Sequence, residues 1–107
     1  MQGIRAVCLL IILTSSTKFA LADTEALKIL LLRNNCTACH MIDKRKYGPQ
    51  LIEVAEKYAG EAGAAEKLAA KIKAGGTGVW GEDIMPPQPQ VSNADALTIA
   101  EYILGLK

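Results

Sequence analysis

The sequence contains a five-residue motif with a specific chemistry, Cys36-Thr37-Ala38-Cys39-His40. Two thiols separated by two residues can add to the two vinyl groups of one haem, and the next residue then presents an imidazole to the iron. This Cys-x-x-Cys-His pattern is typical of the covalent attachment of a c-type haem. The sequence therefore predicts one haem c, bound through thioethers at Cys36 and Cys39, with His40 as an axial ligand of the iron.

Residues 1–22 have the pattern of a cleaved secretory signal peptide. Arg5 precedes an apolar run over residues 6–13, and Ala20-Leu21-Ala22 provides a small-residue cleavage site before Asp23. A membrane-spanning helix needs about 20 consecutive apolar residues, and this run is much shorter. A lipoprotein would carry a cysteine directly after the cleavage site, where Asp23 stands. We therefore expect export to the periplasm, with no membrane anchor left after cleavage.

Residues 23–107 then form one small domain with few metal ligands and few large side chains. These 85 residues contain two cysteines, one histidine and four aromatic side chains, and their ten basic and eleven acidic residues give a formal charge of −1. A structural zinc site needs four Cys or His ligands, and a thioredoxin-like redox pair needs a βαβ pattern that the sequence lacks. The nearly balanced charge provides no strong field for nucleic acid. A core this small needs additional support, which an attached haem would provide.

The domain is predicted to be all-α. Apolar residues recur at helical spacing over residues 24–34, 50–58 and 62–73, and a last helix begins after Ser92, which can act as its N-cap. Prolines exclude regular helix over residues 85–89, and no alternating apolar pattern of strand length occurs. The glycines between residues 75 and 78 are expected to let the backbone approach the haem edge.

Met85 is expected to be the second axial ligand. The domain has no second histidine, so ligation by two histidines of one chain is excluded. Tyrosine or lysine could ligate in principle, but methionine is the usual partner of histidine where the iron cycles electrons. Met41 adjoins His40 and cannot reach the opposite face of the ring, whereas Met85 is distant in the chain and precedes two prolines. The alternative for Met85 is a methionine that fills a gap in the core.

Four short motifs follow one another along residues 23–107. They are Cys36-Thr37-Ala38-Cys39-His40, Tyr47-Gly48-Pro49, Gly78-Val79-Trp80-Gly81 and Met85-Pro86-Pro87. In this order and spacing the chain resembles the short class I monohaem cytochromes c of denitrifying and ammonia-oxidising bacteria. The resemblance implies the cytochrome c fold, in which four to five helices surround one covalently attached haem. The first and last helices of that fold cross, here near Leu31 and Tyr102.

The resemblance also implies roles for residues around the haem. Pro49 matches a proline whose carbonyl accepts a hydrogen bond from the ligand histidine's Nδ1–H, and Trp80 matches a tryptophan whose indole N–H reaches a haem propionate. Two positions depart from the family pattern. Lys71 stands where an arginine often clamps a propionate, so a single ammonium replaces a bidentate fork. Gln88 stands where an asparagine often donates to the methionine sulfur, and its longer side chain disfavours that hydrogen bond.

An iron bound by both His40 and Met85 has no vacancy for a substrate or for oxygen. The sequence therefore predicts a soluble one-electron carrier and not an enzyme. The resemblance implies a monomer that docks transiently on redox partner proteins at the exposed haem edge, between respiratory donors and terminal reductases or oxidases. The alternatives are a haem enzyme or gas sensor with a labile sixth ligand, and a thiol–disulfide protein without haem. The basic run over residues 44–46 is either a solvated surface or a feature that steers an acidic partner.

Overall fold

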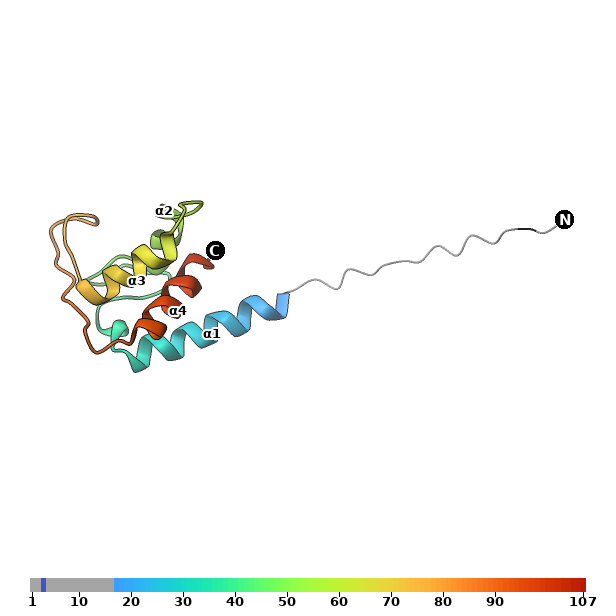
Figure 1. The fold of residues 1–107 in the computed structure, drawn as a ribbon, viewed down its shortest axis with the longest axis horizontal. Coiled ribbons are helices and arrows are strands. Elements are labelled where there is room, and N and C mark those ends of the chain that lie inside the picture. Colours follow the sequence, from blue (N-terminus) through green and yellow to red (C-terminus); the bar gives the residue numbers. More distant parts are fainter. Residues whose placement is uncertain (1–2, 4–16) are drawn as a thin grey trace.

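The computed structural model describes Gly3 and residues 17–107, with side chains from Asp23 onward. These residues form four α-helices and one short 3₁₀ helix, in the order α1 (Thr17–Arg33), η1 (Cys36–Ala38), α2 (Leu51–Lys57), α3 (Ala64–Ala74) and α4 (Asn93–Leu104) (Figure 1). Over residues 17–107 no strand forms, and one isolated antiparallel bridge joins Gly76 to Met85. The prediction of an all-α domain is confirmed. The predicted signal peptide lies mostly outside the described residues and stays a prediction.

Helix α1 begins at Thr17, seven residues before the start that the apolar pattern predicts. Residues 17–23 contain neither glycine nor proline, so nothing in them interrupts a helix that extends toward the N-terminus. At the other end, the backbone N–H and the Nδ2 of Asn34 both donate to the Leu30 carbonyl, at 3.1 and 2.9 Å. Asn35 then adopts a left-handed conformation with φ of 61°, which asparagine tolerates better than most residues. The chain therefore turns directly from α1 into η1.

The other helix boundaries lie within two residues of the prediction. Helix α2 follows Gln50, whose backbone is extended, and α3 begins only at Ala64 because Gly63 has a left-handed φ of 72°. The hydroxyl of Ser92 accepts a hydrogen bond from the Asp95 backbone N–H at 3.0 Å, which confirms the predicted N-cap of α4.

The hydrophobic core lies where α4 packs against the other three α-helices. Helices α1 and α4 lie against each other although they come from opposite ends of the described chain (Figure 1), as the resemblance implies. Leu27, Val91 and Ile99 are the largest fully buried side chains. Leu31 is buried in the same core and Tyr102 packs against it. On one side this core borders a cavity.

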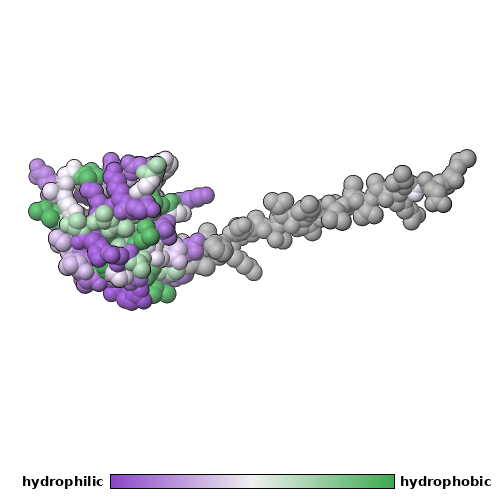
Figure 2. Space-filling model, in the orientation of Figure 1, coloured by the Kyte–Doolittle hydropathy of each residue, from purple (hydrophilic) through white to green (hydrophobic). Residues whose placement is uncertain are grey.

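The surface of the domain mixes polar and apolar side chains. Figure 2 shows hydrophilic residues over most of the visible face, with smaller hydrophobic areas between them. Large exposed apolar side chains lie on α1 and in the two loops that border the cavity; they are Ile29, Leu32, Met41, Tyr47, Val79 and Ile84. No helix in the described part of the chain is long and apolar enough to cross a membrane.

Candidate haem-binding site

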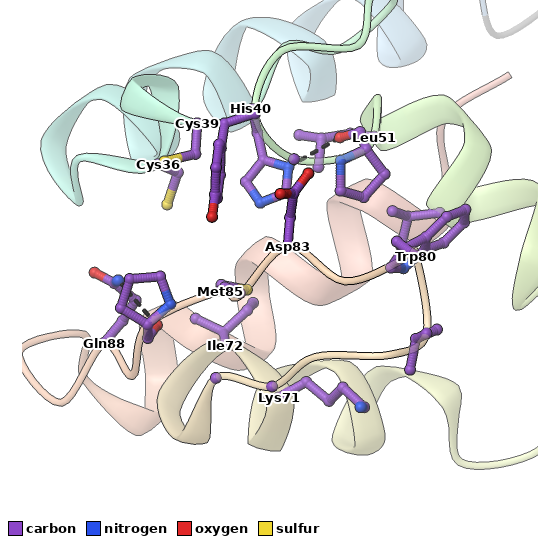
Figure 3. A pocket seen from close by; sticks show the side chains of 18 of the residues that line it. Cys36, Cys39, His40, Leu51, Lys71, Ile72, Trp80, Asp83, Met85 and Gln88 are labelled. Carbon is purple, nitrogen blue, oxygen red and sulfur yellow. Dashed lines mark hydrogen bonds between the residues drawn. The ribbon is translucent and has the colours of Figure 1, made fainter.

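A cavity of about 320 Å³ brings together all the residues that the sequence singles out as haem ligands or haem contacts (Figure 3). Its base is apolar and comes from the four α-helices and the C-cap residue of α2, through Leu31, Leu51, Val54, Tyr58, Leu68, Ile99 and Ile103. Two loops form its sides: residues 35–49, here called the His40 wall, and residues 75–88, here called the Met85 wall. The predicted site residues that line it are Cys36, Cys39, His40, Pro49, Lys71, Trp80, Met85 and Gln88. An apolar base with a few converging polar groups is the usual character of a cofactor site.

The η1 turn presents the two cysteines and the histidine on one side of the cavity (Figure 3). The backbone N–H groups of Cys39 and His40 both donate to the Cys36 carbonyl, at 3.1 and 3.0 Å, so the motif is one tight turn. Cys36 and Cys39 are not joined by a disulfide. Burial raises the pKa of the Cys36 thiol above its ordinary value, which keeps it neutral. Within residues 17–107, no group of three His, Cys, Asp or Glu side chains gathers in a way that could hold a metal ion on its own.

The imidazole of His40 is fixed by the chain that returns past it. Its Nδ1 lies 2.9 Å from the Pro49 carbonyl oxygen. Since a carbonyl only accepts, Nδ1 must carry the proton and Nε2 is left as the lone-pair donor. Gly48 donates its backbone N–H to the Cys39 carbonyl at 2.8 Å, and a Cβ at Gly48 would come within 2.8 Å of Nδ1. Glycine is therefore required beside the ring. The sequence reasoning did not assign this role, although a glycine directly before Pro49 is a signal for it.

Met85 faces His40 from the opposite side of the cavity (Figure 3). Its backbone exchanges two hydrogen bonds with Gly76: Met85 N–H donates to the Gly76 carbonyl at 2.8 Å, and Gly76 N–H donates to the Met85 carbonyl at 3.0 Å. Gly75 has a left-handed φ of 70°, and a Cβ there would overlap the Met85 carbonyl oxygen and the nitrogen of Pro87. The expectation that these glycines let the backbone approach the haem edge stays a prediction. At Gly75 the close approach that the structure shows is made by the backbone that follows Met85.

The remaining predicted contacts occupy the edge of the cavity. Trp80 is half-buried and packs against the core, and the ammonium of Lys57 lies 5.6 Å from the centre of its ring. Lys71 reaches the cavity from α3. The amide of Gln88 donates to the Pro86 carbonyl at 3.1 Å and accepts from Nε2 of Gln90 at 2.7 Å.

Comparison with known proteins identifies the architecture around this cavity. The family model described as cytochrome c matches residues 28–107. The chain belongs to the cytochrome c family. It is 59% identical over 72 residues to cytochrome c-551 of Azotobacter vinelandii, an alignment that covers 67% of this chain and 87% of the relative. It is 47% identical over 89 residues to cytochrome c-552 of Nitrosomonas europaea, covering 83% of this chain and 82% of the relative.

A solved structure agrees with the sequence comparison. The crystal structure of wild-type Nitrosomonas europaea cytochrome c552 superposes with a TM-score of 0.73 at 49% identity, over 75% of this chain and 99% of that chain. The chain is therefore a small class I monohaem cytochrome c that carries one covalently attached c-type haem. It is a small electron carrier that works with redox partner proteins, in a family whose members transfer electrons and are not enzymes.

Proposed function

We propose that the haem of this cytochrome is attached through Cys36 and Cys39, and that its iron is bound by Nε2 of His40 and the sulfur of Met85. The observation that carries the proposal is the placement of the imidazole and the thioether on opposite sides of one apolar cavity, with both thiols on the imidazole side (Figure 3). Each attachment is the addition of a thiol S–H across a vinyl C=C bond, so all atoms are retained. With both axial positions filled, no position is left for a substrate.

The chain holds the ligands in a geometry that suits rapid electron transfer. The Pro49 carbonyl fixes the Nδ1–H tautomer of His40 and makes Nε2 a stronger donor. The paired hydrogen bonds between Gly76 and Met85 fix the backbone that carries the thioether. When bound, the haem supplies an iron that alternates between the ferric and ferrous states. A thioether ligand and an apolar cavity both favour the ferrous state, so we expect a raised reduction potential.

Three further residues are assigned by their position on the cavity edge. Lys71 and Trp80 supply an ammonium and an indole N–H, which are suitable donors for haem propionates. We assign Gln88 no hydrogen bond to the Met85 sulfur, because its side chain is longer than that of asparagine and its amide nitrogen donates to the Pro86 carbonyl.

We further propose that the carrier is a monomer that works in the periplasm after residues 1–22 are removed. The composition of residues 1–22 and the similarity to bacterial cytochromes c support this location. Exposed apolar side chains of Tyr47, Val79 and Ile84 line the cavity and offer a surface for transient docking. The partners we propose are respiratory donors on one side and terminal reductases or oxidases on the other.

The ligand assignment is tested by spectra of the holoprotein purified from a periplasm with an intact haem-attachment system. We expect Met85→Ala to keep the covalent haem, to lose the weak thioether-to-iron charge-transfer band of the ferric protein and to lower the reduction potential. Met41→Ala is the matched control, because Met41 adjoins His40 but does not line the cavity. A spectrum of Met85→Ala that matches wild type would overturn the assignment.

The same preparation separates the proposal from its rivals. A haem enzyme or sensor with a labile sixth ligand would bind added cyanide or carbon monoxide without a lag or denaturant. A thiol–disulfide protein would be colourless, with two titratable thiols.

A further inference from the structure

Within the Met85 wall, residues 77–84 form a loop between the two residues of the Gly76–Met85 bridge. This loop is here called the Met85 loop, because it leads into Met85. The hydroxyl of Thr77 lies 3.1 Å from the Glu82 carbonyl and 3.3 Å from the Asp83 carbonyl. The Gly78 N–H donates to the Gly81 carbonyl at 2.9 Å. These contacts are all internal. They shape the loop but do not attach it to the other side of the cavity.

Two side-chain contacts join the Met85 loop to other parts of the chain. On one side, the Lys57 ammonium from α2 lies over the ring of Trp80. On the other, a guanidinium nitrogen of Arg45 lies 3.7 Å from Oδ2 of Asp83. Figure 3 shows Asp83 projecting from the Met85 loop toward the His40 side of the cavity. Among the described residues, Arg45–Asp83 is the one ion pair that joins the two walls.

The position of this ion pair matters more than its strength. Both side chains are about half exposed, at 53% and 55%. Such a pair changes the equilibrium constant of a conformational change that breaks it by no more than about five-fold. Global unfolding of a domain is little altered by so small an effect. Local opening of a loop needs much less free energy than global unfolding, and a five-fold change in the open population is readily measured there.

We propose that Arg45 and Asp83 are a positioning pair that clasps the Met85 loop across the mouth of the haem cavity and so limits how often the Met85 sulfur leaves the iron. The inference rests on the proposed function in one respect, the assignment of Met85 as the axial ligand. Neither residue touches the iron. The pair acts through the backbone, because Asp83 lies two residues before Met85 and its carbonyl is braced by Thr77.

The rate at which external imidazole replaces the sixth ligand of the ferric holoprotein tests the clasp. At imidazole concentrations where the rate no longer rises, that rate measures opening of the Met85 loop. We expect Arg45→Gln and Asp83→Asn each to open about two- to five-fold faster than wild type at low salt. The double variant should open no faster than either single variant, since each already lacks the pair. At about 1 M salt, where charges are screened within about 3 Å, the wild-type rate should rise to the rate of the variants.

Two neighbouring substitutions provide matched controls. Lys44→Gln and Glu82→Gln make the same charge changes in the same two loops, and neither side chain takes part in an ion pair among the described residues. We expect both to open at nearly the wild-type rate. Equal acceleration in the controls would mean that net charge, and not the clasp, governs opening, and would overturn the proposal.

Three other results test the clasp and separate it from the ligand assignment. Arg45→Asp combined with Asp83→Arg should restore slow opening. Altered denaturant unfolding in Arg45→Gln with an unchanged imidazole rate would indicate a merely structural pair and overturn the clasp alone. An unchanged spectrum in Met85→Ala would overturn the ligand assignment, and the clasp with it.

Discussion

His40 and Met85 lie on two walls of one cavity that are built in different ways. The His40 wall is tied along its length by successive backbone hydrogen bonds, from Gly48 to Cys39, from Leu51 to Met41 and from Ile52 to Ile42, at 2.8–3.0 Å. The Met85 wall is an irregular loop of similar length, and its backbone hydrogen bonds to the rest of the chain lie only at its two ends, at Gly75 and Gln88. Exposed side chains at Val79 and Ile84 add little packing to it.

The difference indicates which ligand is the more secure. The imidazole is fixed by neighbours within about ten positions in the chain, so its geometry forms with the local turn. The thioether comes from a distant segment and is positioned by a few contacts, of which two involve exposed cations. We therefore expect perturbations to release Met85 before they disturb His40, and the following changes probe that order.

The largest effect is expected on the His40 wall. Replacement of both thiols, Cys36→Ser with Cys39→Ser, should abolish covalent haem attachment, because serine hydroxyls do not add to vinyl groups under the same conditions. Haem staining after denaturing electrophoresis measures this directly. Met85→Ala should still stain fully. Retention of covalent haem in the double serine variant would contradict the assignment of the two cysteines as the attachment sites.

A large effect is also expected on the Met85 wall, at Gly75. Gly75→Ala combines a left-handed φ of 70° with overlap against the Met85 carbonyl, so it should destabilise the fold and displace the loop. Gly63→Ala is a matched control, because Gly63 has φ of 72° but nothing lies within 4 Å of an added Cβ. Overpacking should make Gly75→Ala less stable than Gly63→Ala by about 1–3 kcal/mol. Chemical denaturation of the two ferric holoproteins gives the difference, and equal stabilities would show that the Met85 wall tolerates the overlap.

A smaller effect is expected from Lys57, which lies over Trp80. Lys57→Gln should weaken the attachment of the Met85 loop by about 0.5–1 kcal/mol and speed hydrogen exchange of the Gly76 and Met85 amides. Lys67→Gln is the comparison, since Lys67 makes a similar contact with Tyr58, at 5.4 Å from the ring centre. Equal acceleration of the two amides in both variants would indicate a general loss of stability and not a local one.

Much of this architecture follows from local sequence patterns. The Cys-x-x-Cys-His motif, the helical faces and the Ser92 cap depend on residues a few positions apart, and the structure bears out the fold they predict. The start of α1 at Thr17 was not predicted, because residues 17–22 suit both a processing segment and an extension of the helix.

The features that were missed depend on contacts between segments that only folding brings together. Gly48 is needed beside the His40 ring and Gly75 beside the Met85 carbonyl. Neither requirement produces a periodic pattern in the sequence. The Arg45–Asp83 pair is likewise invisible in a sequence where both residues stand among other charges. Helix periodicity describes what each element buries, but it does not describe how two irregular loops meet.

The central claim is that one thioether sulfur, from Met85, lies opposite His40 on the iron. Iron K-edge X-ray absorption of the ferric holoprotein counts the sulfur ligands directly. We predict one sulfur in wild type and in Met41→Ala, beside the haem nitrogens and one imidazole nitrogen, and no sulfur in Met85→Ala. A wild-type iron surrounded only by nitrogen or oxygen, or a sulfur that persists in Met85→Ala, would contradict this account.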